Sequence, residues 1–366
     1  MAQPAREFSI APADIHNQTL LANAHPADWV NPRPAPRYNM VVIGAGTAGL
    51  IIAAGAAGLG AKVALIEREL MGGDCLNVGC VPSKALLRSA RAWADVRDAS
   101  AYGVEVPPGA AADFSAAMAR MRRLRAELSA KDSAARYRAL GVDVFIGEGR
   151  FAGPDTVEVT GQTLRLRRGA IATGTRAAAP PIPGLAEAGY LTNETVFSLT
   201  AMPARLIVIG GGAVGCELAQ AFGRFGARVT LLEMAPTIMP QEDADAVFIL
   251  KDSLLREGIE ILEGVSVQGV ERSAAGKRVR LVHDSAPREI EADEILVAAG
   301  RTPIVDGLNL GAAGVEYDRR IGVKVNDRLQ TTNPRIYAAG DISSPYPFTH
   351  TADAAARIVI RNALFL

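Results

Sequence analysis

MVVIGAGTAGL, at residues 40–50, is the stretch that decides the fold of this chain. A run of β-branched residues leads into glycines spaced G-x-G-x-x-G, and an uncharged, alanine-rich run follows. This order predicts a strand, a tight glycine turn and a helix, which together open the βαβ unit of a dinucleotide-binding domain. Gly44 permits the turn, Gly46 lets the backbone approach a pyrophosphate, and Gly49 lets the helix pack closely on the strand.

The same pattern returns at residues 206–218 as LIVIGGGAVGCEL, with Gly210, Gly212 and Gly215 in the motif positions. In each copy a second predicted strand ends on an acidic residue, Glu67 in the first and Glu233 in the second. Each carboxylate stands 23 positions after the first glycine, where it can accept a hydrogen bond from a ribose hydroxyl. A single motif could be a glycine-rich packing turn without a ligand. Two copies, each in strand–turn–helix context and each with its acid, predict two dinucleotide sites.

The composition is that of a soluble globular protein with more than one domain. The 366 residues are 49% hydrophobic and 21% charged, and the formal net charge is +0. Nothing therefore indicates a nucleic-acid groove or an anionic membrane surface as a partner. Residues 1–10 show no secretory signal, so we expect a cytoplasmic protein. The uncharged run at residues 40–61 is long enough to cross a bilayer, but the glycine turn inside it favours strand, turn and helix.

Two of the three cysteines stand in the stretch GGDCLNVGCVPSK at residues 72–84. Cys75 and Cys80 form a C-x4-C frame, and Cys80 opens a predicted helix in which Pro82 fits an early position. Three cysteines are too few for a disulfide scaffold, and a persistent cytoplasmic disulfide is usually catalytic. Inert thiols remain an alternative. We predict no metal site, because there is no second cysteine pair and the four histidines are scattered.

This stretch and the two glycine motifs together resemble the class I pyridine nucleotide-disulfide oxidoreductases, the flavoprotein family that includes dihydrolipoamide dehydrogenase, glutathione reductase and mercuric reductase. The resemblance covers about residues 38–366 and implies an α/β fold with two Rossmann-like dinucleotide-binding domains, the second inserted into the first. We expect a discontinuous FAD-binding domain at residues 38–180 and 306–366 and an NAD(P)H-binding domain at residues 181–305. Residues 1–37, with the proline-rich run at 31–36, are expected to be an N-terminal extension that lies over the surface or is mobile.

The resemblance also implies which residues bind the cofactors. The FAD site would contain Gly44, Gly46, Gly49, Glu67 and Asp341, and the NAD(P)H site would contain Gly210, Gly212, Gly215 and Glu233. The resemblance also implies cofactor binding by Gly73, Asp74, Thr173, Gly174, Gly300 and Gly340. Glu233 would repel a 2′-phosphate, and neither Arg228 nor Met234 supplies an obvious phosphate clamp, so NADH is favoured over NADPH.

In the electron relay that the resemblance implies, hydride passes from the nicotinamide to the flavin, and the flavin reduces a Cys75–Cys80 disulfide. Cys80 would be the flavin-side thiol, favoured as a thiolate by the helix start, and Cys75 the interchange thiol. Lys84 would lie near the flavin, and Glu217 resembles the acidic residue that pairs with it. The alternative for Glu217 is an ordinary exposed residue of the second helix. Cys216, which follows the second glycine turn, is expected to be a packing residue.

Members of this family continue with an interface domain that forms a homodimer and supplies a His–Glu pair, and we expect that domain to be absent after Leu366. The preferred hypothesis is a mercuric reductase-like enzyme that passes electrons to a metal ion or a small-molecule disulfide. A dihydrolipoamide dehydrogenase-like disulfide reductase is one alternative. A transhydrogenase or NADH oxidase, which would not need both cysteines, is another. A non-catalytic flavin-binding fragment is the third.

Overall fold

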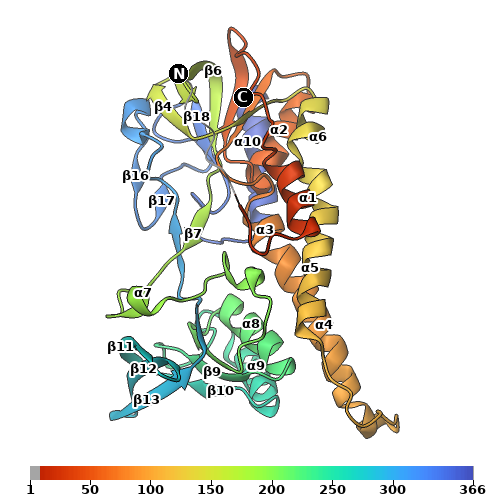
Figure 1. Ribbon diagram of the computed structural model, residues 1–366. Coiled ribbons are helices and arrows are strands. Elements are labelled where there is room, and N and C mark those ends of the chain that lie inside the picture. Colours follow the sequence, from red (N-terminus) through yellow and green to blue (C-terminus); the bar gives the residue numbers. More distant parts are fainter. Residues whose placement is uncertain (1–8, 366) are drawn as a thin grey trace. The chain divides into compact units, whose positions relative to one another are not determined.

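The computed structural model describes residues 9–365 of the chain, and Figure 1 labels its helices and strands. These residues form two compact units. The first comprises the described residues up to Asn77, then Arg125–Arg176, and those from Arg301 on, whereas the second comprises Val78–Leu124 and Ala177–Gly300. The predicted α/β fold class is confirmed, because each unit contains a parallel sheet flanked by helices and the second is inserted into the first. The residue ranges of the FAD- and NAD(P)H-binding domains stay a prediction.

A seven-stranded sheet forms the centre of the first unit. Its parallel part has the order β3-β2-β1-β6, and β18 also pairs in parallel with β6. β4 and β5 extend β6 as an antiparallel meander. The strands span Tyr38–Ile43 (β1), Val63–Glu67 (β2), Asp143–Ile146 (β3), Gly149–Gly153 (β4), Thr156–Val159 (β5), Gln162–Ile171 (β6) and Ile336–Ala338 (β18). β1 and β2 are almost wholly buried, as parallel strands covered on both faces are.

Helices and turns of the first unit are α1 (Ile15–Ala24), α2 (Thr47–Gly58), α3 (Gly73–Asn77), η2 (Ala130–Asp132), α6 (Ala134–Ala139), η4 (Leu310–Ala313) and α10 (Thr349–Phe365), with the short strands β15 (Arg301–Pro303), β16 (Tyr317–Asp318) and β17 (Gly322–Val323). α5 (Phe114–Ser129) and β7 (Thr175–Ala177) run across the boundary between the units. α2 and α10 pack against each other. A Cβ on Gly55 would lie 2.6 Å from Ile360 Cδ1, so glycine at this position lets the two helices pack without a shift of the Ile360 side chain.

The N-terminal extension, expected to lie over the surface or to be mobile, contains a helix that packs on the first unit. Asp14 accepts a hydrogen bond from the Asn17 N–H at 2.8 Å and caps α1, whose Leu20 and Ala24 are buried. Figure 1 shows α1 near α6, and the two helices are in contact. The proline-rich run at residues 31–36 forms neither helix nor strand, as its composition predicts. The extension is therefore a packed part of the first unit from α1 onward.

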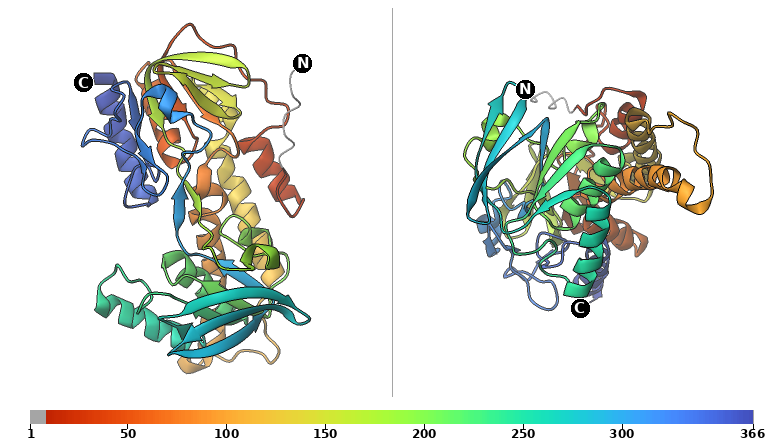
Figure 2. Two further views of the ribbon diagram at one scale, coloured as in Figure 1. Left: turned by 90° about the vertical axis from the view of Figure 1, so that its left-hand side faces the viewer. Right: turned by 90° about the horizontal axis from the view of Figure 1, so that it is seen from below.

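The second unit is built on a parallel sheet of order β10-β9-β8-β14 and an antiparallel sheet of order β11-β12-β13, which Figure 2 shows as a curved ribbon of three strands. Its elements are α4 (Cys80–Arg97), η1 (Ala99–Tyr102), α7 (Leu185–Ala188), η3 (Val196–Ser198), β8 (Arg205–Ile209), α8 (Ala213–Arg224), β9 (Arg228–Leu232), α9 (Ala244–Arg256), β10 (Glu260–Leu262), β11 (Ser266–Ser273), β12 (Gly276–His283), β13 (Ala286–Ala292) and β14 (Glu294–Val297). α4 packs against α8, and both contribute to one apolar core.

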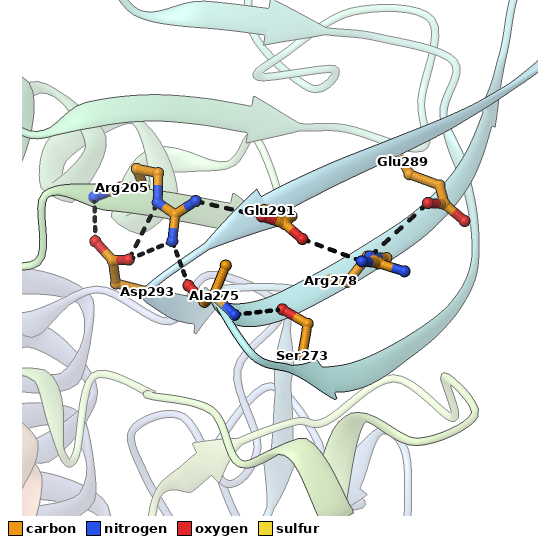
Figure 3. A network of polar contacts seen from close by, with 7 residues as sticks. All are labelled: Arg205, Ser273, Ala275, Arg278, Glu289, Glu291 and Asp293. Atoms are coloured by element: carbon orange, nitrogen blue, oxygen red, sulfur yellow. Dashed lines mark hydrogen bonds and ion pairs between the residues drawn. The ribbon is translucent and has the colours of Figure 1, made fainter.

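A network of charged side chains joins the antiparallel sheet to the start of β8 (Figure 3). Arg205 donates from Nη2 to Asp293 Oδ1 at 2.7 Å, and its backbone N–H donates to Asp293 Oδ2 at 2.8 Å. Its Nη1 lies 3.6 Å from Glu291 Oε2, and Arg278 Nη2 donates to Glu291 Oε1 at 3.2 Å. Positive and negative groups therefore alternate along the network, which favours this pairing of the strands at neutral pH.

The uncharged run at residues 40–61 forms β1, the glycine turn and α2, as predicted. Among residues 9–365, no helix combines the length and the apolar character that crossing a bilayer requires.

Candidate functional site

Two of the three glycines in the first motif are required by the fold itself. Gly44 has a φ of +102°, and a Cβ there would lie 2.4 Å from the Ala172 carbonyl oxygen. A Cβ on Gly49 would lie 1.8 Å from the Gly44 carbonyl oxygen. Gly46 is different: its φ of −80° suits any residue, and its Cβ would meet only the Gly73 Cα at 3.7 Å, an ordinary contact.

The second motif repeats this division of roles. Gly210 has a φ of +111°, and a Cβ on Gly215 would lie 1.9 Å from the Gly210 carbonyl oxygen. Gly212 has a φ of −76°, and a Cβ there would meet no described atom within 4 Å. The described part of the chain thus gives no internal reason for glycine at the middle position. Close approach of a pyrophosphate does give one, so this position fits a bound dinucleotide.

Each motif opens a 12-residue helix that lacks a side-chain cap. Gly46 is the N-cap of α2 and Gly212 the N-cap of α8, and neither helix receives a side-chain hydrogen bond from its cap residue. The first N–H groups of a helix have no intrahelical partner, and the aligned peptide dipoles favour an anion there. Both helix starts therefore have the chemistry of a phosphate site.

The acidic residue of each copy is hydrogen-bonded to the glycine turn before it. The Ala45 N–H donates to Glu67 Oε2 at 2.7 Å, and the Glu69 N–H donates to Oε1 at 2.8 Å. In the second copy, Gly211 and Ala235 donate to the two oxygens of Glu233 at 2.6 and 2.7 Å. Burial raises the pKa of Glu67, and the hydrogen bonds from Glu69 and Ala45 oppose that shift. A carboxylate offers about four lone-pair sites, so each acid keeps acceptor capacity for a ribose hydroxyl.

A second group of polar residues meets at the carboxyl ends of β6 and β18. Thr175 Oγ1 donates to Asp341 Oδ2 at 3.2 Å, and Arg301 Nε donates to Thr175 Oγ1 at 2.6 Å. Arg301 Nη2 also donates to the Thr175 carbonyl at 2.9 Å and to Asp74 Oδ2. Burial raises the pKa of Asp341, and the charge of Arg301 opposes that shift. Arg301 therefore contacts Asp74 directly and is connected to Asp341 through Thr175.

The sequence motifs do not identify Arg301 or Thr175, although each stands directly beside a predicted site residue. Arg301 follows Gly300, and Thr175 follows Gly174. Thr173 holds the segment that contains Ile304, since its Oγ1 donates to the Ile304 carbonyl at 2.8 Å. The remaining glycines, Gly174, Gly300 and Gly340, have φ values of +66°, +108° and +84°, so each marks a sharp turn after a strand.

The segment that contains Cys75 lies directly against the first glycine turn. The Gly72 N–H donates to the Ala45 carbonyl at 2.8 Å, and a Cβ on Gly73 would lie 2.6 Å from the Gly46 Cα. Cys75 is half-buried in α3, two residues after Gly73. A dinucleotide on this turn would therefore be a neighbour of the Cys75 segment.

Cys80 is the first residue of α4 and is exposed, and Pro82 takes the third position of that helix, as predicted. Cys216 is buried in α8, its Sγ donates to the Gly211 carbonyl at 3.3 Å, and burial raises the pKa of its thiol to about 11. Cys216 is thus a packing residue. Among residues 9–365, no group of three or more His, Cys, Asp or Glu side chains is arranged to hold a metal ion.

Lys84 and Glu217 form an ion pair between α4 and α8. Lys84 Nζ donates to Glu217 Oε1 at 2.7 Å and to Oε2 at 2.8 Å. The side chains are 59% and 36% exposed. An exposed pair contributes only about 0–1 kcal/mol to stability, so protein stability gives little reason for this arrangement.

Three comparisons with known proteins identify the family to which this chain is similar. The family model described as pyridine nucleotide-disulphide oxidoreductase matches residues 38–356. A mercuric reductase of Lysinibacillus sphaericus is 36% identical over 327 residues, which are 89% of this chain and 60% of that protein. A dihydrolipoyl dehydrogenase of Thermus scotoductus is 36% identical over 335 residues, covering 89% of this chain and 70% of that protein.

Among solved structures, the Cu(II) complex of the HOCl-induced flavoprotein disulfide reductase RclA from Escherichia coli matches with a TM-score of 0.78 and 29% identity. The match covers 89% of this chain and 71% of that one. The present chain spans 60% of the length of the mercuric reductase from Lysinibacillus sphaericus.

Proposed function

Because this chain belongs to the pyridine nucleotide-disulphide oxidoreductases, we propose that the protein uses FAD to pass electrons from a nicotinamide nucleotide to a Cys75–Cys80 disulfide and on to a small acceptor. The observation that supports this most directly is the contact between the first glycine turn and the Cys75 segment, where Gly72 donates to the Ala45 carbonyl at 2.8 Å. A dinucleotide on this turn would lie beside a thiol. A packing turn without a ligand would explain neither this neighbourhood nor the glycine at position 46.

The residues at the first turn fit FAD. Gly46 and the uncapped start of α2 would hold its pyrophosphate, Glu67 would accept from a ribose hydroxyl, and Asp341 would bond the ribityl or phosphate region. When bound, FAD would accept two electrons from the nicotinamide and supply them to a disulfide. Arg301 would keep Asp341 and Asp74 in place and offset their negative charge.

Each cysteine has its own role in this proposal. By its resemblance to the family, Cys80 would be the thiol on the flavin side, and the N–H groups at the start of α4 would stabilise its thiolate. Cys75 would be the thiol that exchanges with the acceptor. Lys84, held by Glu217 at 2.7 Å, would supply a positive charge near the flavin.

The second site favours NADH over NADPH. Glu233 keeps a carboxylate where a 2′-phosphate would lie, and the residues that follow it, from Met234 to Thr237, include no cation. Met234 is 84% exposed and offers no hydrogen-bond donor. A free 2′-hydroxyl can donate to Glu233, whereas a phosphate would be repelled.

We propose a metal ion of the mercuric type as the preferred acceptor and a small disulfide of the lipoamide type as the alternative. Relatives with both names reach 36% identity, so identity alone does not separate the two acceptors. The preference for NADH favours the lipoamide alternative. A homodimer and a cytoplasmic location complete the proposal for the whole protein.

The test is an anaerobic titration of the FAD-loaded chain with NADH, followed by absorbance. We expect two electrons to enter and a long-wavelength thiolate–flavin band to appear. Cys80→Ser should abolish that band, whereas Cys216→Ser, which changes a buried packing thiol, should keep it. Hg(II) and lipoamide can then be compared as acceptors. If the flavin bleaches without the band, the transhydrogenase or oxidase hypothesis gains, and uptake of FAD without any reduction would indicate a binding protein.

A further inference from the structure

The N-terminal residues hold the segment that contains Cys75 at several points. The Met71 N–H donates to the carbonyl of Ala24, the last residue of α1, at 3.1 Å. The next residue, His25, is bonded through Nδ1 to the Glu69 carbonyl. Residues 69–71, which lead into α3, are therefore attached to the end of α1.

Arg125 connects α1 to the other end of α3. Its Nη1 donates to the carbonyl of Asn77, the last residue of α3, and its Nη2 donates to Asn17 Oδ1, both at 2.7 Å. Arg125 is 3% exposed and Asn17 is 1% exposed. A buried guanidinium is tolerated only where acceptors receive its N–H groups, so the positions of Asn17 and Asn77 depend on each other through Arg125.

Asn17, Arg125 and Asn77 form a hydrogen-bonded bridge, and the two asparagines at its ends are held by further hydrogen bonds. Asn17 Nδ2 donates to the Pro12 carbonyl at 2.8 Å, which directs Oδ1 toward Arg125. Asn77 Nδ2 donates to the carbonyls of Met71 and Gly73 at 3.1 and 2.9 Å, which joins the end of α3 to its beginning. Cys75 lies within the stretch that these bonds close. The cation also satisfies a carbonyl at the C-terminal end of α3, where positive charge is favoured.

The same N-terminal segment has a second attachment that does not involve the Cys75 segment. Asn31 Oδ1 accepts from the Ile146 N–H at 2.8 Å, and Asn31 Nδ2 donates to the Ile146 carbonyl at 3.0 Å. Trp29 Nε1 donates to the Val144 carbonyl at 3.1 Å. These bonds cover β3, the edge strand of the sheet. Asn31 therefore offers a matched control for Asn17.

We propose that Asn17 and Arg125 are positioning residues for Cys75, and that the N-terminal segment of residues 12–31 is a support of the redox segment. Without the bridge, α3 would open locally more often and Cys75 would sample positions outside the site. The inference rests on the proposed function in one respect: it takes Cys75 to be a redox thiol. The attachment itself requires neither cofactor nor turnover.

The test measures Cys75 directly in the full chain with Cys80→Ser and Cys216→Ser, which leaves Cys75 as the only thiol of the three. We expect Asn17→Ala to raise the iodoacetamide alkylation rate of Cys75 and the hydrogen exchange of residues 69–77 by on the order of tenfold. Asn31→Ala should leave both rates within about twofold of the parent while it lowers Tm. Asn17→Asp keeps an oxygen for Arg125 but loses the hydrogen bond to the Pro12 carbonyl, so its rates should lie closer to the parent than those of Asn17→Ala.

Arg125→Lys provides a second disruption, because one ammonium group does not reproduce the forked contact to two acceptors. It should act in the same direction as Asn17→Ala. Parent-like rates in both variants, or an equal increase in Asn31→Ala, would overturn the proposal. Neither readout uses FAD or NADH, so a failed NADH titration would reject the proposed function and leave this result unaffected.

Discussion

The backbone N–H of Gly211 donates to Glu233 Oε2 at 2.6 Å, and this bond joins the second glycine turn to the acid that ends the next strand. The first copy has the same bond, from Ala45 to Glu67 at 2.7 Å. The internal repeat is thus a repeat of hydrogen bonding as well as of sequence. In both copies the acid holds the shape of the turn before any nucleotide arrives.

The two acids should therefore affect two different cofactors. Glu233→Gln places an amide where two backbone N–H groups need an acceptor, so we expect NADH affinity to fall on the order of tenfold or more. The preference for NADH over NADPH should fall with it. Glu67→Gln is the matched control and should weaken FAD binding while NADH binding stays near the wild-type value. Fluorescence titrations of each cofactor measure both effects, and a loss of both affinities in Glu233→Gln alone would contradict the assignment.

Gly212 and Gly215 should respond in opposite ways to the same substitution. A Cβ at position 212 meets no described atom within 4 Å, so Gly212→Ala should change stability by less than about 1 kcal/mol and yet weaken NADH binding. A Cβ at position 215 would lie 1.9 Å from the Gly210 carbonyl oxygen, so Gly215→Ala should lower Tm strongly. Thermal unfolding and an NADH titration of both variants test this. Unchanged NADH binding in Gly212→Ala would mean that the pyrophosphate does not approach there.

Both glycine turns could be predicted from the sequence because each motif is local. The three glycines of each turn and the acid that bonds to it all lie within one βαβ unit, and the helix start at Cys80 is equally local. Arg301 could not be placed in this way, since Asp74 and Thr175 approach it only through the fold. Periodicity and spacing give no information on such distant partners.

The helix in the N-terminal extension was not predicted from the sequence for a different reason. The proline-rich run at residues 31–36 excludes helix and strand locally, and the expectation extended that conclusion to the whole extension. Asp14, which caps α1, was a signal in the sequence that could have predicted the helix. The buried contact from Asn17 to Arg125 had no such signal, because it joins residues far apart along the chain.

The Arg205–Asp293 pair predicts how the second unit responds to acid. The hydrogen bond from Arg205 lowers the pKa of Asp293 below its ordinary value of 3.8. The folded pKa lies below the unfolded one, so the contribution to stability is present above pH 3.8 and is lost as pH falls through the folded pKa. Asp293→Asn should therefore lower Tm at pH 7, and the difference from wild type should shrink as pH falls below 3.8.

Asp284→Asn, at a side chain that is 88% exposed, should change Tm little at any pH. A Tm difference for Asp293→Asn that stayed constant down to the lowest pH would argue against this pair as the cause.

Glu217→Gln decides whether the Lys84 pair belongs to the redox site or is an ordinary surface contact. Both side chains are at least 36% exposed, so its loss should cost at most about 1 kcal/mol and leave Tm almost unchanged. If Lys84 supplies charge near the flavin, the neutral partner should slow anaerobic reduction by NADH and alter the thiolate–flavin band.

Glu316→Gln is the matched control, because Glu316 pairs with Lys324 at 3.0 Å on the exposed surface of the first unit. Stopped-flow absorbance of both variants gives the comparison. Equal rates and identical spectra would assign Glu217 to the surface, whereas a slower reduction in Glu217→Gln alone would assign the pair to the redox site.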